Sequence, residues 1–171
     1  PPQGELRPLV LRYTAEALHA SNRLPEAEYI LQTLVSEDPE NADARRWLGI
    51  IYFDLGAYSA SIEQFTALAE LEPDDFRPHR LKGMMYYDFE QNEQAIESYR
   101  QALELSPPSD VQNEILQELA SVYVALRKYD EAREVIDQAQ PTAVLEVLAA
   151  RCLWSDGQAD AALKKLESAK R

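Results

Sequence analysis

Small and apolar side chains recur along this chain at intervals of three or four residues, separated by short polar stretches. Residues 42–73 show the pattern well. Leu48 and Gly49 come before a turn at Gly56, and Phe65 comes after it. This spacing is typical of amphipathic helices that each bury one face. Because Gly49 has no side chain, two helices can approach closely there, and the stretch predicts a packed helix pair.

Three prolines divide the chain at a constant interval. Pro39, Pro73 and Pro107 follow one another every 34 residues, each after an acidic or polar segment. Proline lacks the amide hydrogen that a continuing helix needs, and it disfavours helix in the residue before it. The interval therefore predicts repeated helix pairs, the first beginning near Pro8. We align the units at residues 8–41, 42–75, 76–109, 113–142 and 143–171.

The second unit carries a recognisable pattern. Counted from Ala42 as position 1, the positions 7, 8, 11, 24 and 32 hold Leu48, Gly49, Tyr52, Phe65 and Pro73. This pattern resembles the tetratricopeptide repeat, a helix–turn–helix unit of about 34 residues. The resemblance implies an all-α fold, a right-handed superhelical α-solenoid of about ten antiparallel helices in helix–turn–helix pairs. One such domain is expected over residues 1–171, as a fragment of a longer protein.

Two local features add to this interpretation. Asn41 stands just before the first helix of the second unit, where its side-chain oxygen can accept a hydrogen bond from an unpaired amide. The turn of the first unit reads SNRL and lacks the usual glycine, although the apolar pattern around it is intact. A single helix pair cannot cover its own apolar face, so we expect neighbouring pairs to bury each other.

Charge disfavours two classes of partner. The chain has 30 acidic and 17 basic residues, which gives a formal net charge of −13. This charge repels nucleic-acid phosphates and anionic lipid surfaces. No apolar run approaches the roughly 20 residues needed to span a bilayer, so direct membrane insertion is not expected. The chain opens with PPQGELRP, without an initiator Met. The sequence does not indicate a cellular compartment.

Residues able to carry catalysis are few. His19 and His79 fall in different units, and His79 takes position 4, where packing between helices is the expected role. Cys152 lies in an apolar helix without a local His, which favours a buried structural thiol over a nucleophile. The sequence contains no zinc-binding spacing, no GxSxG motif and no phosphate-binding glycine loop. We therefore expect no enzyme activity, no metal and no cofactor.

The resemblance also implies a binding surface. In the tetratricopeptide family the first helix of each unit lines the concave face, with positions 2, 5, 9, 12 and 13 directed into it. In this acidic chain, several of these positions hold arginine, beside aromatic and methionine side chains. A guanidinium matches a carboxylate, and its apolar neighbours offer contact area. The predicted groove consists of Arg12, His19, Arg46, Ile50, Phe53, Arg77, Arg80, Met84 and Tyr87.

We expect a non-catalytic interaction scaffold whose groove binds a protein or peptide with acidic and apolar residues. The alternative interpretation is that the arginines pair with acidic neighbours and form an ordinary solvated face. Those neighbours would be Glu16, Asp43, Asp54 and Asp88.

A second function, structural or self-associating, is also open. The C-terminal end of the last unit would pack against another copy, as in a homodimer, or against the rest of the parent chain. That end consists of Ala162, Leu163, Leu166 and Ala169, with Trp154 nearby.

Overall fold

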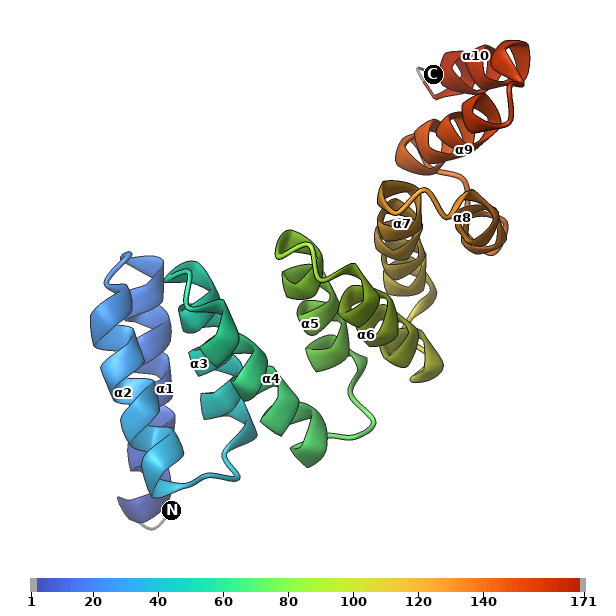
Figure 1. Cartoon of the computed structure of the whole chain (residues 1–171). Coiled ribbons are helices and arrows are strands. Elements are labelled where there is room, and N and C mark those ends of the chain that lie inside the picture. Colours follow the sequence, from blue (N-terminus) through green and yellow to red (C-terminus); the bar gives the residue numbers. More distant parts are fainter. Residues whose placement is uncertain (1–2, 170–171) are drawn as a thin grey trace. The chain divides into compact units, whose positions relative to one another are not determined.

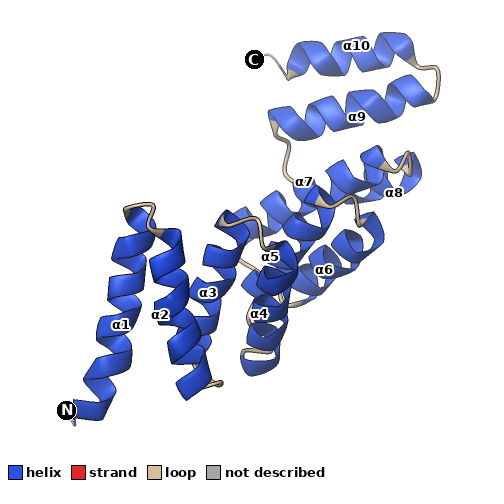
Figure 2. Cartoon of the chain, turned by 60° about the vertical axis from the view of Figure 1, so that its left-hand side comes forward, coloured by secondary structure: helices blue, strands red, loops and turns tan. Residues whose placement is uncertain are grey.

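The computed structural model describes residues 3–169, and side chains are described for residues 6–167 and 169. Every regular element in that range is an α-helix (Figures 1 and 2), as expected for an all-α helical repeat solenoid. The helices are α1 (Gln3–Ala20), α2 (Leu24–Glu37), α3 (Ala42–Asp54), α4 (Tyr58–Leu71), α5 (Phe76–Asp88), α6 (Asn92–Glu104), α7 (Ser109–Ala125), α8 (Tyr129–Ile136), α9 (Ala143–Ser155) and α10 (Ala159–Ser168).

The chain divides into two compact parts, residues 1–78 and 79–171. The first part contains α1 to α4 and the start of α5, and the second contains the rest of α5 and α6 to α10. In the first part α1 packs on α2, α2 on α3, and α3 on α4. In the second part α6 packs on α7, α7 on α8 and α9, and α9 on α10. The two helices of a pair run antiparallel through a short turn (Figure 1).

The turn within each pair has the same backbone conformation. A residue of positive φ, between 57° and 76°, occupies position 15 of every unit as aligned above. The residue after it donates to the carbonyl five residues earlier, as Ala57 N does to Tyr52 O at 2.8 Å. This is the Schellman closure of a helix C-terminus. The residues at position 15 are Asn22, Gly56, Glu90, Arg127 and Gly157.

Glycine at position 8 allows close approach in two pairs. A Cβ on Gly49 would lie 2.8 Å from Cζ of Phe65 on the facing helix. A Cβ on Gly83 would lie equally close, 2.8 Å, to the ring of Tyr99. Both distances are too short for real side chains, so the ring occupies the space that a larger residue would need. The close approach predicted at Gly49 is confirmed.

Each part has its own buried core. In the second unit, position 20 is Ser61, where the other four units have alanine. The Ser61 hydroxyl is buried and donates to the Gly49 carbonyl at 2.6 Å, so its burial leaves no donor unpaired. The first part's central cluster consists of Ala15, Ala27, Leu31, Leu34, Ala44, Leu48 and Ile51. In the second part, Tyr99, Ala102, Ile115, Leu119, Val122 and Tyr123 are among the buried residues.

Helix boundaries follow the predicted stops. The helices α2, α4 and α6 end at Glu37, Leu71 and Glu104, each shortly before one of the three prolines. Asn41 has extended φ/ψ, and its Oδ1 accepts from the amide of Ala44 at 2.9 Å, which confirms the predicted N-cap.

The predicted start of the first helix is wrong. The helix α1 begins at Gln3, and Pro8 lies inside it. Pro8 is only about a turn and a half from the N-terminus, so its missing amide removes an intrahelical hydrogen bond without ending the helix. A proline near the start of a helix therefore indicates that a helix is present, but it does not fix the first residue of that helix.

Candidate binding surface

The predicted groove residues stand on the first helices of three pairs, α1, α3 and α5. None of them is buried. The first part of the chain carries Arg12, His19, Arg46, Ile50, Phe53 and Arg77, and the second carries Arg80, Met84 and Tyr87.

Arg12 and Arg46 flank one carboxylate, that of Asp43. Arg12 Nε lies 3.9 Å from Oδ2 of Asp43, and Arg46 Nη1 donates to its Oδ1 at 3.0 Å. Arg12 also pairs with Glu16 one turn along α1, and its guanidinium stands 4.2 Å from the ring centroid of Tyr13. Two guanidinium groups from neighbouring helices are therefore held side by side at the surface of the first part.

Arg46 also contacts the segment that follows α4. Its Nη2 pairs with Glu72 and lies 3.7 Å from Oδ2 of Asp75. Within the described side chains its buried Nε has no hydrogen-bond partner. Asp75 accepts from the amide of Arg77 at 3.0 Å and from Arg77 Nε at 2.8 Å. Burial acts to raise the pKa of Asp75, but these hydrogen bonds and the charges of Arg77 and Arg46 together outweigh it and hold the pKa below its usual value.

His19 connects α1 to α3. Its Nε2 lies 2.6 Å from Oδ2 of Asp54, and its ring meets that of Trp47 edge to face, with centroids 5.7 Å apart. Further along α3, Phe53 makes a similar edge contact with Tyr58, at 5.6 Å. His19 thus takes part in the seam between two repeats, while still being partly exposed at the predicted surface.

In the second part, Arg80 bridges two glutamates of α7. Its Nη1 lies 2.8 Å from Glu114, and its Nη2 lies 2.6 Å from Glu118. The hydrogen bond to Glu118 is the main cause that raises the pKa of Arg80, and the guanidinium stays charged. Met84 and Tyr87 follow Arg80 on α5 and are both exposed. The charged and apolar groups of the prediction therefore share this helix.

Every arginine of the predicted groove has an acidic neighbour. Two of the partners named in the alternative interpretation, Glu16 and Asp43, contact Arg12, whereas Asp54 contacts His19 instead. Sequence reasoning missed the other acids because they stand on different elements from the arginines. The sequence does place these acids at the end of one unit or in the first helix of the next, and that position could have been used to predict the contacts. These missed acids are Glu72, Asp75, Glu114 and Glu118.

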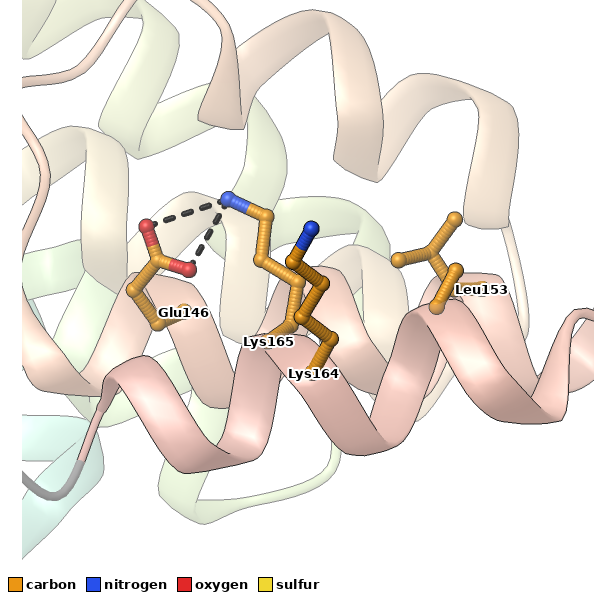
Figure 3. A pocket seen from close by; sticks show the side chains of 5 residues that line it. Glu146, Leu153, Lys164 and Lys165 are labelled. Carbon is orange, nitrogen blue, oxygen red and sulfur yellow. Dashed lines mark hydrogen bonds and ion pairs between the residues drawn. The ribbon is translucent and has the colours of Figure 1, made fainter.

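A hollow of about 380 Å³ lies between α9 and α10 (Figure 3). Lys165 reaches Glu146 across it, with Nζ 2.8 Å from one carboxylate oxygen and 3.1 Å from the other. The remaining lining comes from Leu153, Ala161 and Lys164. Because the ion pair joins the two helices of one repeat, the hollow belongs to the packing of the last pair.

Other chemistry-bearing residues have structural surroundings. His79 Nδ1 lies 2.9 Å from Oε1 of Gln101, a contact between the two helices of its unit. Cys152 is buried, and desolvation raises the pKa of its thiol, which favours the protonated form. In the described range no three His, Cys, Asp or Glu residues are grouped so as to hold a metal ion. Over the same range no helix has the length and apolar character needed to cross a membrane.

Comparison with known proteins identifies the family. Models of the tetratricopeptide repeat match residues 15–85, 81–109 and 114–140. The chain therefore belongs to the tetratricopeptide repeat family, whose fold is that of a protein-interaction scaffold. The last helix pair, α9 and α10, lies beyond the matched residues. No curated protein matches the chain significantly in sequence.

Solved structures share the fold at low identity. One structure of MamA is 18% identical, with a TM-score of 0.84 over 95% of this chain and 89% of that one. Another MamA structure is 19% identical, with a TM-score of 0.81 and 91% of each chain covered. YrrB, described as a TPR protein with an unusual peptide-binding site, is 18% identical, with a TM-score of 0.77 over 93% of this chain and 82% of that one.

Proposed function

We propose that this chain is a non-catalytic scaffold that binds a peptide or partner protein through the predicted groove residues of α1 and α3 in the first part of the chain, with a second, similar set of residues on α5. The observation that carries the proposal is the pair of guanidinium groups that flank Asp43, from Arg12 on α1 and Arg46 on α3. Accessible apolar side chains lie beside Arg46 on α3. Arg46 precedes Ile50 by one helical turn and Phe53 by two, and both apolar residues are partly exposed.

The second part supplies a similar combination on α5. Arg80 is followed at the same two intervals by Met84 and Tyr87. An arginine with apolar groups one and two turns away matches a ligand with an acidic residue beside apolar ones. The order of these groups is the same on α3 and α5, so each helix by itself offers the same chemistry to a peptide.

The acidic neighbours define how such a ligand would bind. Each guanidinium already has a carboxylate partner, and partly exposed ion pairs contribute about 1 kcal/mol or less. A ligand carboxylate can therefore replace Glu16 or Asp43 at little cost, but it also gains little. Most of the affinity would come from apolar contact with Ile50 and Phe53, while the arginines select acidic ligands. Long-range repulsion from the net charge of −13 would slow association with an acidic ligand at low salt.

The structural neighbour YrrB supports peptide binding as a function that this fold can carry. Its identity to this chain is 18%, so the neighbour lends no residue to the argument, and the ligand chemistry rests on the side chains of this chain alone.

A selection from a random peptide library displayed on phage, followed by titration of the selected peptides, tests the proposal. We expect peptides that combine acidic and apolar residues. Phe53→Ala should weaken binding by roughly tenfold, as truncation of a central interface residue does, and Arg46→Gln should weaken it by roughly fivefold or less. Arg23→Gln is the matched control, because Arg23 pairs with Glu26 in the turn after α1 and is not one of the groove residues.

Circular dichroism melting curves would show that each variant is folded. Selected peptides whose affinity is unchanged by both Phe53→Ala and Arg46→Gln would place binding elsewhere and reject the proposed groove. Equal loss in the Arg23→Gln control would show that charge alone, rather than this surface, controls binding.

A further inference from the structure

Arg12 has two carboxylate partners that differ in exposure. Glu16, one turn along α1, pairs with it and has a side chain that is 25% exposed. Asp43, at the start of α3, is 59% exposed, and its Oδ2 lies 3.9 Å from Nε of Arg12. The other oxygen of the same carboxylate accepts from Arg46 at 3.0 Å. One partner of Arg12 is therefore held within the helix packing, and the other is mostly in contact with solvent.

The second part of the chain has the same arrangement around Arg80. Glu118 on α7 is 23% exposed and accepts from Nη2 of Arg80 at 2.6 Å. Glu114, one turn earlier on α7, is 60% exposed and lies 2.8 Å from Nη1. The two parts of the chain therefore each place one sheltered and one exposed acid against an arginine.

The two exposed acids occupy the same position of the repeat. Both arginines are at position 5 of a unit, and both exposed acids are at position 2 of the next unit, which is expected to face the groove. At the other two junctions position 2 is Arg77 or Val144, so the arrangement belongs to these two sites and not to the repeat pattern. The outer acids are Asp43 and Glu114, and the inner acids are Glu16 and Glu118.

Inner and outer acids contribute differently to the folded chain. An inner acid is largely shielded from water, so its removal would leave the facing guanidinium without the partner that orients it. An outer acid keeps most of its contact with water, and such an exposed ion pair contributes little to stability. Its carboxylate can turn away from the arginine and remain solvated. The outer acid is therefore the partner that a ligand carboxylate can replace.

We infer that the outer acids compete with the ligand: Asp43 at Arg12 and Arg46, and Glu114 at Arg80, take the place of a ligand carboxylate. This inference rests on the proposed function, because it names the residue that an acidic peptide displaces. An outer acid offers the arginine the same chemical group as the ligand, and its attachment to the chain keeps its effective concentration high. After displacement it stays nearby and repels the incoming carboxylate. Outer acids therefore lower the affinity for acidic peptides but not for neutral ones.

A titration with glutarate, a small dicarboxylate, tests the inference without a selected peptide. The measurement is the NMR signal of the Arg12 Nε–Hε group in the 171-residue chain, at constant ionic strength. Asp43→Asn should lower the glutarate concentration at half-saturation by roughly twofold to fivefold. Glu40→Gln is the matched control, because Glu40 is exposed in the turn before α3 and its replacement removes the same charge there.

The second part of the chain provides an independent variant. Glu114→Gln, measured at the Nε–Hε signal of Arg80, should strengthen glutarate binding by the same factor. The inner-acid variant Glu118→Gln should not, because the guanidinium then loses the partner that orients it. This variant also keeps the inference testable if Asp43→Asn is not folded, which circular dichroism melting curves would show.

Peptides obtained from the library selection connect the inference to the proposed groove. Asp43→Asn should tighten binding of an acidic peptide by roughly twofold to fivefold. The same peptide with its acidic residues changed to their amides should bind this variant and the unchanged chain equally. Glu16→Gln removes an inner acid and should not reproduce the gain.

The experiments separate failure of the inference from failure of the proposed function. Peptides that bind equally well to Phe53→Ala and Arg46→Gln would reject the groove, while the glutarate titration would still decide whether Asp43 competes for Arg12. Glutarate binding that is no tighter in Asp43→Asn than in Glu40→Gln would overturn the inference. An equal gain from Glu16→Gln would also overturn it, because the loss of any nearby charge would then explain the effect.

Discussion

The helix pairs α3–α4 and α5–α6 solve the same packing problem with different residues. Both place glycine at position 8 beneath an aromatic ring at position 24, Gly49 under Phe65 and Gly83 under Tyr99. Their turns differ, because the positive φ at position 15 is taken by Gly56 in the first pair and by Glu90 in the second. In these two pairs the ring leaves no room for a side chain at position 8, whereas the left-handed backbone at position 15 tolerates a side chain at a cost.

The two pairs also cap their first helices differently. Asn41 accepts from the amide of Ala44 at 2.9 Å, and Asp75 accepts from the amide of Arg77 at 3.0 Å. A neutral amide caps α3 and a carboxylate caps α5, so only the second cap depends on pH. One repeat geometry is therefore compatible with residues that differ in their contribution to the free energy of unfolding and in how that contribution depends on pH.

The largest effect is expected where a ring fills the space above glycine. Gly49→Ala and Gly83→Ala should each lower the free energy of unfolding by about 1 to 3 kcal/mol, because the new methyl would overlap the ring. Adding Phe65→Leu to Gly49→Ala should recover part of that loss. Urea unfolding followed by circular dichroism measures both, and the absence of any recovery would contradict ring overlap as the cause.

Substitutions at position 15 of the two pairs should change the free energy of unfolding in opposite directions. Gly56→Ala should lower the free energy of unfolding by about 1 kcal/mol, since an L side chain is strained at positive φ. Glu90→Gly should raise it by about 0.5 to 1 kcal/mol because the strain is removed. Thermal unfolding by calorimetry compares them, with Arg127→Gly as a second test of stabilisation. Changes of the same sign at residues 56 and 90 would refute the argument from backbone strain.

Position 20 offers a smaller test. Ser61→Ala removes the hydroxyl that donates to the Gly49 carbonyl and should cost about 1 kcal/mol. The reverse change in the other pair, Ala95→Ser, should be destabilising unless its hydroxyl finds the equivalent carbonyl of Gly83. Chemical unfolding of the two variants measures the difference, and a stabilising Ser61→Ala would show that the buried hydroxyl is not satisfied.

The smallest effect concerns the pH dependence of the two caps. The pKa of Asp75 is lower in the folded chain than its usual value, so its stabilising contribution is complete above the unfolded pKa, near pH 4, and is lost as the pH falls through the folded pKa. The contribution should be about 1 kcal/mol or less. Asp75→Asn should flatten the acid limb of the stability curve, and Asn41→Asp should steepen it. A curve unchanged by both variants would remove the carboxylate cap as a source of pH dependence.

Local signals predicted the fold because each acts over a few residues. The prolines after α2, α4 and α6 marked helix ends, Asn41 marked a helix start, and Gly49 marked a close approach. Each depends on backbone geometry or on the absence of a side chain. The start of α1 was wrong because Pro8 disfavours a helix interior but does not forbid it near the first turns, where few hydrogen bonds are lost.

Ion pairing could not be predicted in the same way. Glu72 and Asp75 reach Arg46 from a different segment, and Glu118 reaches Arg80 from α7. A charged side chain can pair with any acid within reach, and the sequence contains 30 of them. The choice among them depends on distances of a few ångströms between helices. The arginines were placed correctly on the first helices, but their partners required coordinates.

The sequence by itself determined the repeat period, the helix pairs and the glycines at close contacts, because these follow from the preferences of single residues and from their spacing. The tertiary structure alone decided which carboxylate each arginine meets and which residues accept a positive φ without being glycine. Those outcomes depend on what lies opposite a residue in space. A repeating pattern gives similar residue types to every unit, but only packing shows which side chain of a neighbouring helix each of them meets.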